Sequence, residues 1–250
     1  MKRFGLTPVK AFENTVDSTF FDVINTEEKA YLLGFFIADG CINTSTDRSK
    51  GRFAINQSID DLEIVEAFKK CLNVPSDIQY VNNQTGAKNR KVQCRLRWTS
   101  THMEKTLTTK YHITPKKTQD SSFYFPIEDV PENLQGHFVR GFIDGDGYMG
   151  DNGKEGNFSI SIVGTSISFL ETIGDLISKA TGMTYSIYST HGKTCEYHSL
   201  RWSCEHVDKL NKIKKLQNYL YNNATIFLHR KKEKIDHYIE YRANYLCNSK

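Results

Sequence analysis

Two nine-residue stretches of this 250-residue chain have nearly the same sequence. Residues 32–40 read Leu-Leu-Gly-Phe-Phe-Ile-Ala-Asp-Gly, and residues 139–147 read Val-Arg-Gly-Phe-Ile-Asp-Gly-Asp-Gly. Each is an apolar run of helical character that ends in an acid and a glycine. A carboxylate in the last turn of a helix faces the negative end of the helix dipole, which costs roughly 0.3–1 kcal/mol. Two such acids in matching surroundings therefore indicate that a cation binds between them.

The similarity continues beyond these two stretches. Asp39 and Asp146 are 107 positions apart (146 − 39). Two later pairs of segments repeat at almost the same separation: 52–57 with 157–162, and 96–99 with 200–203. The only two tryptophans, Trp98 and Trp202, fall on the last pair. We interpret the chain as a tandem duplication of a unit of roughly 100 residues, which predicts pseudo-two-fold symmetry within one molecule.

Each copy predicts the order helix, two strands, helix, two strands, helix. The predicted helices cover about 28–39 and 60–72 and begin again near 102 in the first copy; in the second they cover 132–146 and 166–181 and begin again near 206. This order predicts an α+β fold. The predicted organisation is an N-terminal extension (1–27), a first repeat (28–118), a linker (119–131) and a second repeat (132–250).

The predicted strands alternate between apolar and polar residues, so one face of each sheet packs on helices and the other is polar. The polar face carries Arg, Asn, Gln and Ser with almost no acid, which favours reading of DNA bases over a merely solvated surface. The candidate DNA-contacting residues on the strands are Arg52, Asn56, Gln93, Arg95, Arg97, Asn157, Ser159, Ser161, Ser199 and Arg201. Two basic clusters also suit a polyanion and add Lys116, Lys117, Arg230, Lys231 and Lys232.

Small residues recur at a spacing of four in both predicted motif helices. They are Gly34 and Ala38 in the first helix, and Gly141 and Gly145 in the second. Residues four apart share a helix face, and small ones let two backbones approach closely. We therefore expect the two helices to pack on each other, which brings Asp39 and Asp146 together.

The glycines that follow the acids, Gly40 and Gly147, are predicted to take the left-handed conformation that often ends a helix. Two converging carboxylates near a polyanion repel each other and the DNA, and a bound Mg²⁺ relieves this because hard divalent cations take carboxylate and phosphate oxygens. The corresponding chemistry is metal-assisted phosphodiester hydrolysis.

The two stretches resemble the LAGLIDADG motif, which names a family of homing endonucleases, and the order of elements resembles its single-chain, two-repeat members. The resemblance covers residues 28–245. It implies two antiparallel, saddle-shaped sheets joined by the two packed motif helices. It also implies a monomer without an obligate protein partner that cuts both strands of a long, nearly palindromic DNA site and leaves 3′ overhangs. Mg²⁺ is the implied cofactor, and Mn²⁺ can substitute for it.

By the same resemblance, Asp39 and Asp146 are the catalytic residues and metal ligands, joined by the carbonyl groups of Ala38 and Gly145. The second motif departs from the family's apolar pattern at Arg140, which we expect on a solvent-facing side of the helix. Many members also place a lysine or glutamine near the metals. The positions that match locally hold other residues here: Ser58, Ile59, Thr101, Thr165 and Glu205.

The first residues have charge but lack the apolar core and cleavage site expected of a signal peptide. The longest apolar run, residues 30–38, is far shorter than the ~20 residues that span a bilayer. The six cysteines of the chain form no Cys-x-x-Cys pair and indicate reduced thiols. We therefore expect a cytoplasmic or organellar protein that is not secreted. Two alternative functions stay open at this point: an RNA maturase that binds intron RNA, and a DNA-binding regulator of the same fold without catalysis.

Overall fold

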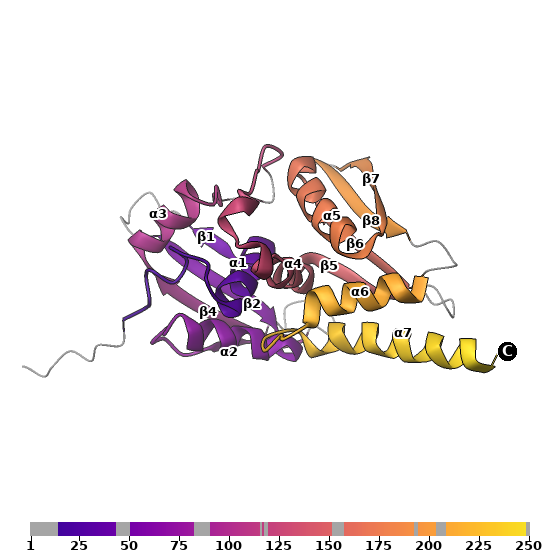
Figure 1. The fold of residues 1–250 in the computed structure, drawn as a ribbon. Coiled ribbons are helices and arrows are strands. Elements are labelled where there is room, and N and C mark those ends of the chain that lie inside the picture. The colour runs from indigo at the N-terminus through magenta and orange to yellow at the C-terminus, as the bar shows by residue number, and fades with distance from the viewer. Residues whose placement is uncertain are drawn as a thin grey trace, which may run out of the picture.

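The computed structural model describes residues 15–43, 51–82, 91–115, 117, 120–151, 158–192, 195–203 and 209–248. Two central helices, α1 (Glu27–Asp39) and α4 (Glu132–Asp146), lie side by side between two four-stranded antiparallel sheets (Figure 1). The first sheet has the strand order β1-β2-β4-β3 and the second has the order β5-β6-β8-β7. The same order in both halves confirms the predicted α+β fold and its duplication.

The remaining elements follow the predicted sequence in each repeat. In the first repeat they are β1 (Cys41–Asn43), β2 (Arg52–Ser58), η1 (Ile59–Asp61), α2 (Leu62–Cys71), β3 (Gln79–Val81), β4 (Gln93–Thr99) and α3 (Thr101–Thr109), followed by η3 (Ile127–Asp129). In the second they are β5 (Gly147–Asp151), β6 (Phe158–Gly164), α5 (Ile167–Thr181), β7 (Thr184–His191), β8 (Glu196–Ser203), α6 (Lys209–Tyr221) and α7 (His229–Asn248). No predicted element covers α7, which runs alongside α6.

Local sequence explains where several of these helices begin. The hydroxyl oxygens of Thr26, Ser100 and Ser166 accept hydrogen bonds from backbone N–H groups in the first turns of α1, α3 and α5. The strand alternation also holds: Phe53, Ile55, Leu96 and Trp98 are buried, and so are their counterparts in the second sheet. In the first repeat the indole of Trp98 stacks on Phe53 at 5.4 Å and on Phe68 at 6.1 Å, so aromatic contacts join the sheet to α2.

The contact between α1 and α4 leaves no room for a side chain at two glycines. A Cβ atom added to Gly34 would lie less than 3.0 Å from the carbonyl oxygen of Phe138, and one added to Gly141 would lie less than 3.0 Å from that of Tyr31. The partners are related by the same 107-residue separation as the two acids (141 − 34 and 138 − 31). The two glycines therefore make reciprocal contacts across the pseudo-two-fold axis.

Strand register shows which residues of the two sheets are equivalent. Ala54 pairs with Cys41 and Arg97, whereas Ser161 pairs with Tyr148 and Arg201. Ala54 is thus equivalent to Ser161, at a separation of 107. The predicted match of segment 52–57 with 157–162 is wrong by two residues. A shift of two keeps every side chain on its own face, so the alternating Phe-x-Ile pattern alone does not reveal the slip.

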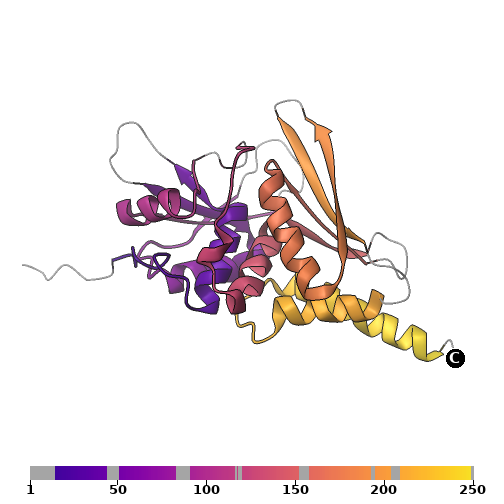
Figure 2. The same ribbon diagram turned by 45° about the horizontal axis from the view of Figure 1, so that its top comes forward.

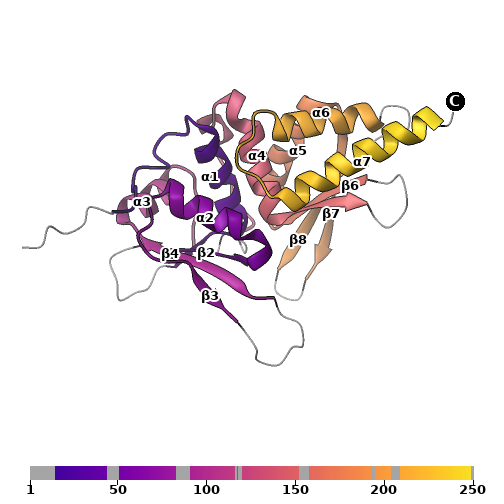
Figure 3. The ribbon, with the colours of Figure 1, turned by 90° about the horizontal axis from the view of Figure 1, so that it is seen from below.

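Both sheets fan out on one side of the central helices, and α2, α6 and α7 lie on the other (Figures 2 and 3). The described part of the N-terminal extension packs on the first repeat, where the Asp22 carboxylate accepts a hydrogen bond from the Thr106 hydroxyl at 2.8 Å and the Tyr111 hydroxyl donates to the Phe21 carbonyl at 2.9 Å. Among the described residues, no helix is long and apolar enough to cross a bilayer.

Candidate active site at the ends of the motif helices

The structure brings the two motif acids together at the C-terminal ends of α1 and α4. A Cβ atom added to Gly145 would lie less than 3.0 Å from the methyl carbon of Ala38 and 3.4 Å from Oδ2 of Asp39. Both Asp39 and Asp146 are exposed to solvent. Two carboxylates thus share one small region at the centre of the molecule.

Gly40 and Gly147 do not take the predicted left-handed conformation. Their φ angles are −72° and −80°, with extended ψ values, because the chain passes directly from each helix into strand β1 or β5. Glycine is required there for space instead. A Cβ atom at Gly40 would lie less than 3.0 Å from the Phe36 ring, and one at Gly147 would lie 2.7 Å from the carbonyl oxygen of Ile143.

The carboxyl group of Asp146 holds its proton more tightly than an ordinary aspartate. The surrounding protein partly desolvates it although its surface is exposed, and the nearby Asp39 carboxylate repels its negative charge; together they raise the pKa of Asp146 to about 6. The ammonium groups of Lys117 and Lys231 lie close enough to oppose this shift. A cation bound between the two acids would relieve their repulsion.

Gln57, which the sequence analysis missed, is the polar side chain that binds Asp39. Its Nε2 donates a hydrogen bond of 2.7 Å to Oδ2 of Asp39. It lies near the end of strand β2, one residue before Ser58, where the family resemblance placed a lysine or glutamine. Strand register makes Gly164 its equivalent in the second repeat, so this position offers no side chain to Asp146. The signal was present in the sequence but was read one position too late.

Two lysines bind the ends of the motif helices in a symmetric way. Lys117 Nζ donates to the carbonyl oxygen of Gly40, and Lys231 Nζ donates at 2.7 Å to that of Gly147. Burial lowers the pKa of Lys117, although the negative charge of Asp146 opposes this shift. Burial also lowers the pKa of Lys231, to about 8. These two ammonium groups offset the negative charge at the C-terminal ends of α1 and α4. The sequence had led us to expect that a bound cation alone does so.

The prediction that Lys231 contacts DNA is wrong. The residue is 4% exposed, and its ammonium group also donates to the carbonyl oxygens of Ile143 and Asp144. All three of its protons are therefore used inside the protein. Lys117, predicted for the same role, lines a cavity of about 330 Å³ together with Asp146, Gly164 and Thr165, so it lies at the acids.

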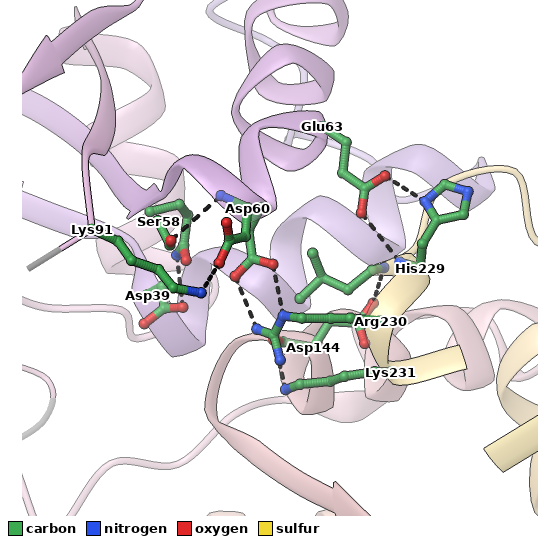
Figure 4. A network of polar contacts seen from close by, with 12 residues as sticks. Asp39, Ser58, Asp60, Glu63, Lys91, Asp144, His229, Arg230 and Lys231 are labelled. Atoms are coloured by element: carbon green, nitrogen blue, oxygen red, sulfur yellow. Dashed lines mark hydrogen bonds and ion pairs between the residues drawn. The ribbon is translucent and has the colours of Figure 1, made fainter. Parts of the chain in front are cut away.

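The other residues of the C-terminal basic cluster pair with acids of the protein (Figure 4). The Arg230 guanidinium makes two hydrogen bonds to the Asp61 carboxylate, at 2.7 and 2.9 Å, and Lys232 pairs with Asp236 at 2.5 Å. His229 pairs with Glu63. The beginning of α7 is thereby attached to α2 of the first repeat, which indicates a structural role for this cluster.

Asp144 anchors the same segment from inside the protein. Its Oδ2 accepts hydrogen bonds of 2.9 Å from the Tyr31 hydroxyl and from the Leu228 N–H. Burial raises its pKa to about 6. Asp144 stands in the motif between Ile143 and Gly145, but it faces the α1–α4 contact and α7, away from the two exposed acids.

Arg140 is buried, contrary to the expectation that it faces solvent. Its guanidinium forms an ion pair of 2.6 Å with Glu27 and donates to the carbonyl oxygens of Leu220 and Ile226. It also lies 4.9 Å from the centre of the Tyr31 ring. These partners could not be predicted from the residues around Arg140, because they are far away in the sequence.

The predicted DNA-contacting residues of the strands lie on the sheet faces that point away from the core. Among the described residues these are Arg52, Asn56, Gln93, Arg95 and Arg97 on the first sheet, and Ser159, Ser161, Ser199 and Arg201 on the second. Lys116, Asn157 and Glu205 lie outside the described residues. The structure thus presents two polar surfaces that flank the acids.

A duplicated α+β unit whose central helices both end in an acid at the symmetry axis defines a class of two-repeat proteins. The family model of the LAGLIDADG-like domain matches residues 26–105 and 133–214, and the chain belongs to this family. No curated protein sequence matches the chain.

Solved structures show the same fold. The homing endonuclease I-WcaI, bound to its DNA recognition sequence, superimposes with a TM-score of 0.56 at 14% identity, over 92% of this chain and 95% of that one. Mesophilic variants of the homing endonuclease I-DmoI give 0.54 at 18% identity, over 84% and 97%. I-DmoI in complex with DNA and Mn gives 0.51 at 20% identity, over 78% and 97%.

Proposed function

We propose that this protein is a site-specific endonuclease that hydrolyses both strands of a long DNA site with a divalent metal ion. The observation that carries the proposal is the convergence of Asp39 and Asp146 between two outward-facing polar sheets. Membership of the LAGLIDADG-like family supports it. The DNA-bound structures of I-WcaI and I-DmoI support it as well, since the same fold carries DNA there.

The residues at the site fit Mg²⁺ or Mn²⁺. Among the described residues, no group of three or more His, Cys, Asp or Glu side chains could form a complete protein cage for a metal ion. Two carboxylates with room around them suit Mg²⁺, which is commonly held by one or two carboxylates while water and substrate phosphate complete its shell. Asp39 and Asp146 would hold the metal, with the carbonyl oxygens of Ala38 and Gly145 as further ligands.

The metal, when bound, would activate water and stabilise the leaving oxygen of the phosphodiester. The protein side chains contribute orientation and charge. Gln57 holds one oxygen of Asp39 through its hydrogen bond, and the other oxygen would be available to a bound metal. Lys117, which lies beside Asp146, would offset negative charge on a phosphate bound at the acids. Outward-facing side chains such as Arg52 and Arg97 would hold the duplex across the site.

The direct test is cleavage selection. A genomic or randomised DNA library is incubated with the protein and Mg²⁺, and the double variant Asp39→Asn/Asp146→Asn is treated in parallel. Ends that converge on one long site, carry 3′ overhangs and are missing with the variant support the proposal. No cleavage by a folded protein, combined with tight binding of intron RNA or of uncut DNA, would replace it by a maturase or a DNA-binding regulator.

A further inference from the structure

Equivalent positions on the two outward sheet faces carry different chemistry. On the first sheet, Gln79 pairs with Arg95, and Arg95 pairs with Asn56. On the second sheet, Tyr188 pairs with Ser199, and Ser199 pairs with Val163. Strand register makes these two rows equivalent, and it extends them by one more residue each, Gln93 and Tyr197.

Hydrogen bonds link the side chains of the row on the first sheet, and the donor and acceptor of each bond are fixed. Arg95 Nε donates to Oδ1 of Asn56 at 3.2 Å, and Nδ2 of Asn56 donates to Oε1 of Gln93 at 3.2 Å. A guanidinium can only donate, so the amide oxygen of Asn56 must face it, and the amide nitrogen must then face the oxygen of Gln93. The groups left over are the terminal nitrogens of Arg95 and Nε2 of Gln93. This row therefore presents donors to a ligand.

The row on the second sheet exposes apolar groups beside hydroxyl groups instead of a row of charged or amide donors. Val163 is 50% exposed, Tyr188 56% and Tyr197 38%, so this face of the sheet offers the Val163 isopropyl group and two aromatic rings to a ligand. The nearby cation, Arg201, lies over the Tyr188 ring at 5.6 Å, and its Nε donates to the Ser199 hydroxyl at 3.2 Å. The isopropyl group of Val163 is at the surface.

These two surfaces suit different base pairs in a major groove. Guanine presents two acceptors there, N7 and O6, which match a row of donors, whereas thymine presents a methyl group, which matches an apolar side chain. From these rows, and on the basis of the proposed function, we infer that the two halves of the DNA site are read differently. Arg95 and Gln93 select guanine in one half, and Val163 selects thymine in the other.

Selection of bound DNA from a randomised library tests this inference, with the uncleaving variant Asp39→Asn/Asp146→Asn as the background. We expect guanine in one half of the enriched site and thymine at the corresponding positions of the other half. Adding Arg95→Ala should relax guanine discrimination in the first half by about 5- to 100-fold and leave the second half unchanged. Adding Val163→Asn should remove the thymine preference and leave the first half unchanged.

Lys179→Ala provides a matched control, because Lys179 is a charged residue on α5 that pairs with Glu132 away from the sheet faces. It should change neither half, and all variants should keep the unfolding midpoint of the background. Equal base preferences in both halves, no enriched sequence, or an effect of both variants on the same half would overturn the inference. If the halves differ as expected but wild-type protein with Mg²⁺ leaves the selected site uncut, the inference stands and the proposed endonuclease function fails.

Discussion

The two repeats agree at the helix contact and differ around the acids. Gly34 and Gly141 make reciprocal contacts with carbonyl groups of the opposite helix. At the acids, Gln57 donates to Asp39, whereas its equivalent, Gly164, leaves a cavity of about 330 Å³ beside Asp146. The backbone contact tolerates no added atom on either side, so both copies keep it. The surroundings of the acids have no such constraint, and there the two copies differ.

The largest expected effect comes from the acids, where the repeats should behave alike. We expect Asp39→Asn or Asp146→Asn to lower double-strand cleavage by about a thousandfold or more, because the loss of a charged metal ligand removes several kcal/mol of transition-state stabilisation. DNA affinity should stay largely intact. Cleavage of a plasmid carrying the selected site, with binding followed by fluorescence anisotropy, measures both. Wild-type rates from both single variants would remove the acids from the mechanism.

The next effect is on stability, and it tests the symmetric half of the comparison. Gly34→Ala and Gly141→Ala should each lower the free energy of unfolding by about 1–3 kcal/mol, because the added carbon meets a carbonyl oxygen that neither helix can move away. Gly164→Ala is the matched control: its added carbon would make an ordinary contact of 3.5 Å with Leu170. Urea unfolding of the three variants gives the result, and a large difference between Gly34→Ala and Gly141→Ala would break the proposed reciprocity.

The sequence predicts well what depends on local pattern or on the repeat itself. The order of elements, the buried faces of the strands and the convergence of Asp39 and Asp146 follow from periodicity and duplication. Assignments based on charge fare worse. Lys231 and Arg140 read as surface cations, but each finds partners from distant segments, the one at the carbonyl oxygens that end α4 and the other at Glu27. Burial of a cation is set by tertiary contacts, which no local pattern contains.

Register is the second limit of prediction. Because side chains alternate with a period of two, the sequence cannot distinguish an alignment of the repeats from one shifted by two residues. That shift decides which residue of the second repeat corresponds to Gln57. The hydrogen bond between Gln57 and Asp39, and the absence of a side chain at Gly164, become visible only when the strand pairing is known.

A third prediction concerns the repulsion between the acids. In metal-free protein, Asp39→Asn should lower the pKa of Asp146 below its value of about 6, because a neighbouring negative charge is removed while the desolvation remains. Carbon-13 NMR of the carboxyl groups measures the titration directly. An unchanged pKa would mean that the acids are too far apart to share a cation.

The same shift sets the sign of two pH effects. Folded Asp146 holds its proton more tightly than the unfolded chain does between pH 3.8 and about 6, so its contribution to stability is present at low pH and is lost as the pH rises through 6. Metal binding has the opposite dependence, since the metal must displace that proton. Affinity for Mn²⁺, measured by calorimetry, should therefore fall below pH 6 and level off above it.

The smallest expected effect tests the asymmetry itself. Gln57→Leu removes the hydrogen bond to Asp39 and should slow cleavage of one strand by about tenfold or less, because one exposed charge-assisted hydrogen bond contributes little more than 1 kcal/mol. Supercoiled plasmid with one target site should then accumulate as the nicked circle. Gly164→Gln is the reciprocal variant, which the backbone allows since an added Cβ meets only ordinary contacts. If glutamine orients the acid, Gly164→Gln should raise the rate at which the strand assigned to Asp146 is cleaved. Strand-specific end labels will show which strand's cleavage rate each variant changes. If Gln57→Leu slows cleavage of both strands equally, Gln57 acts in DNA binding and does not orient Asp39.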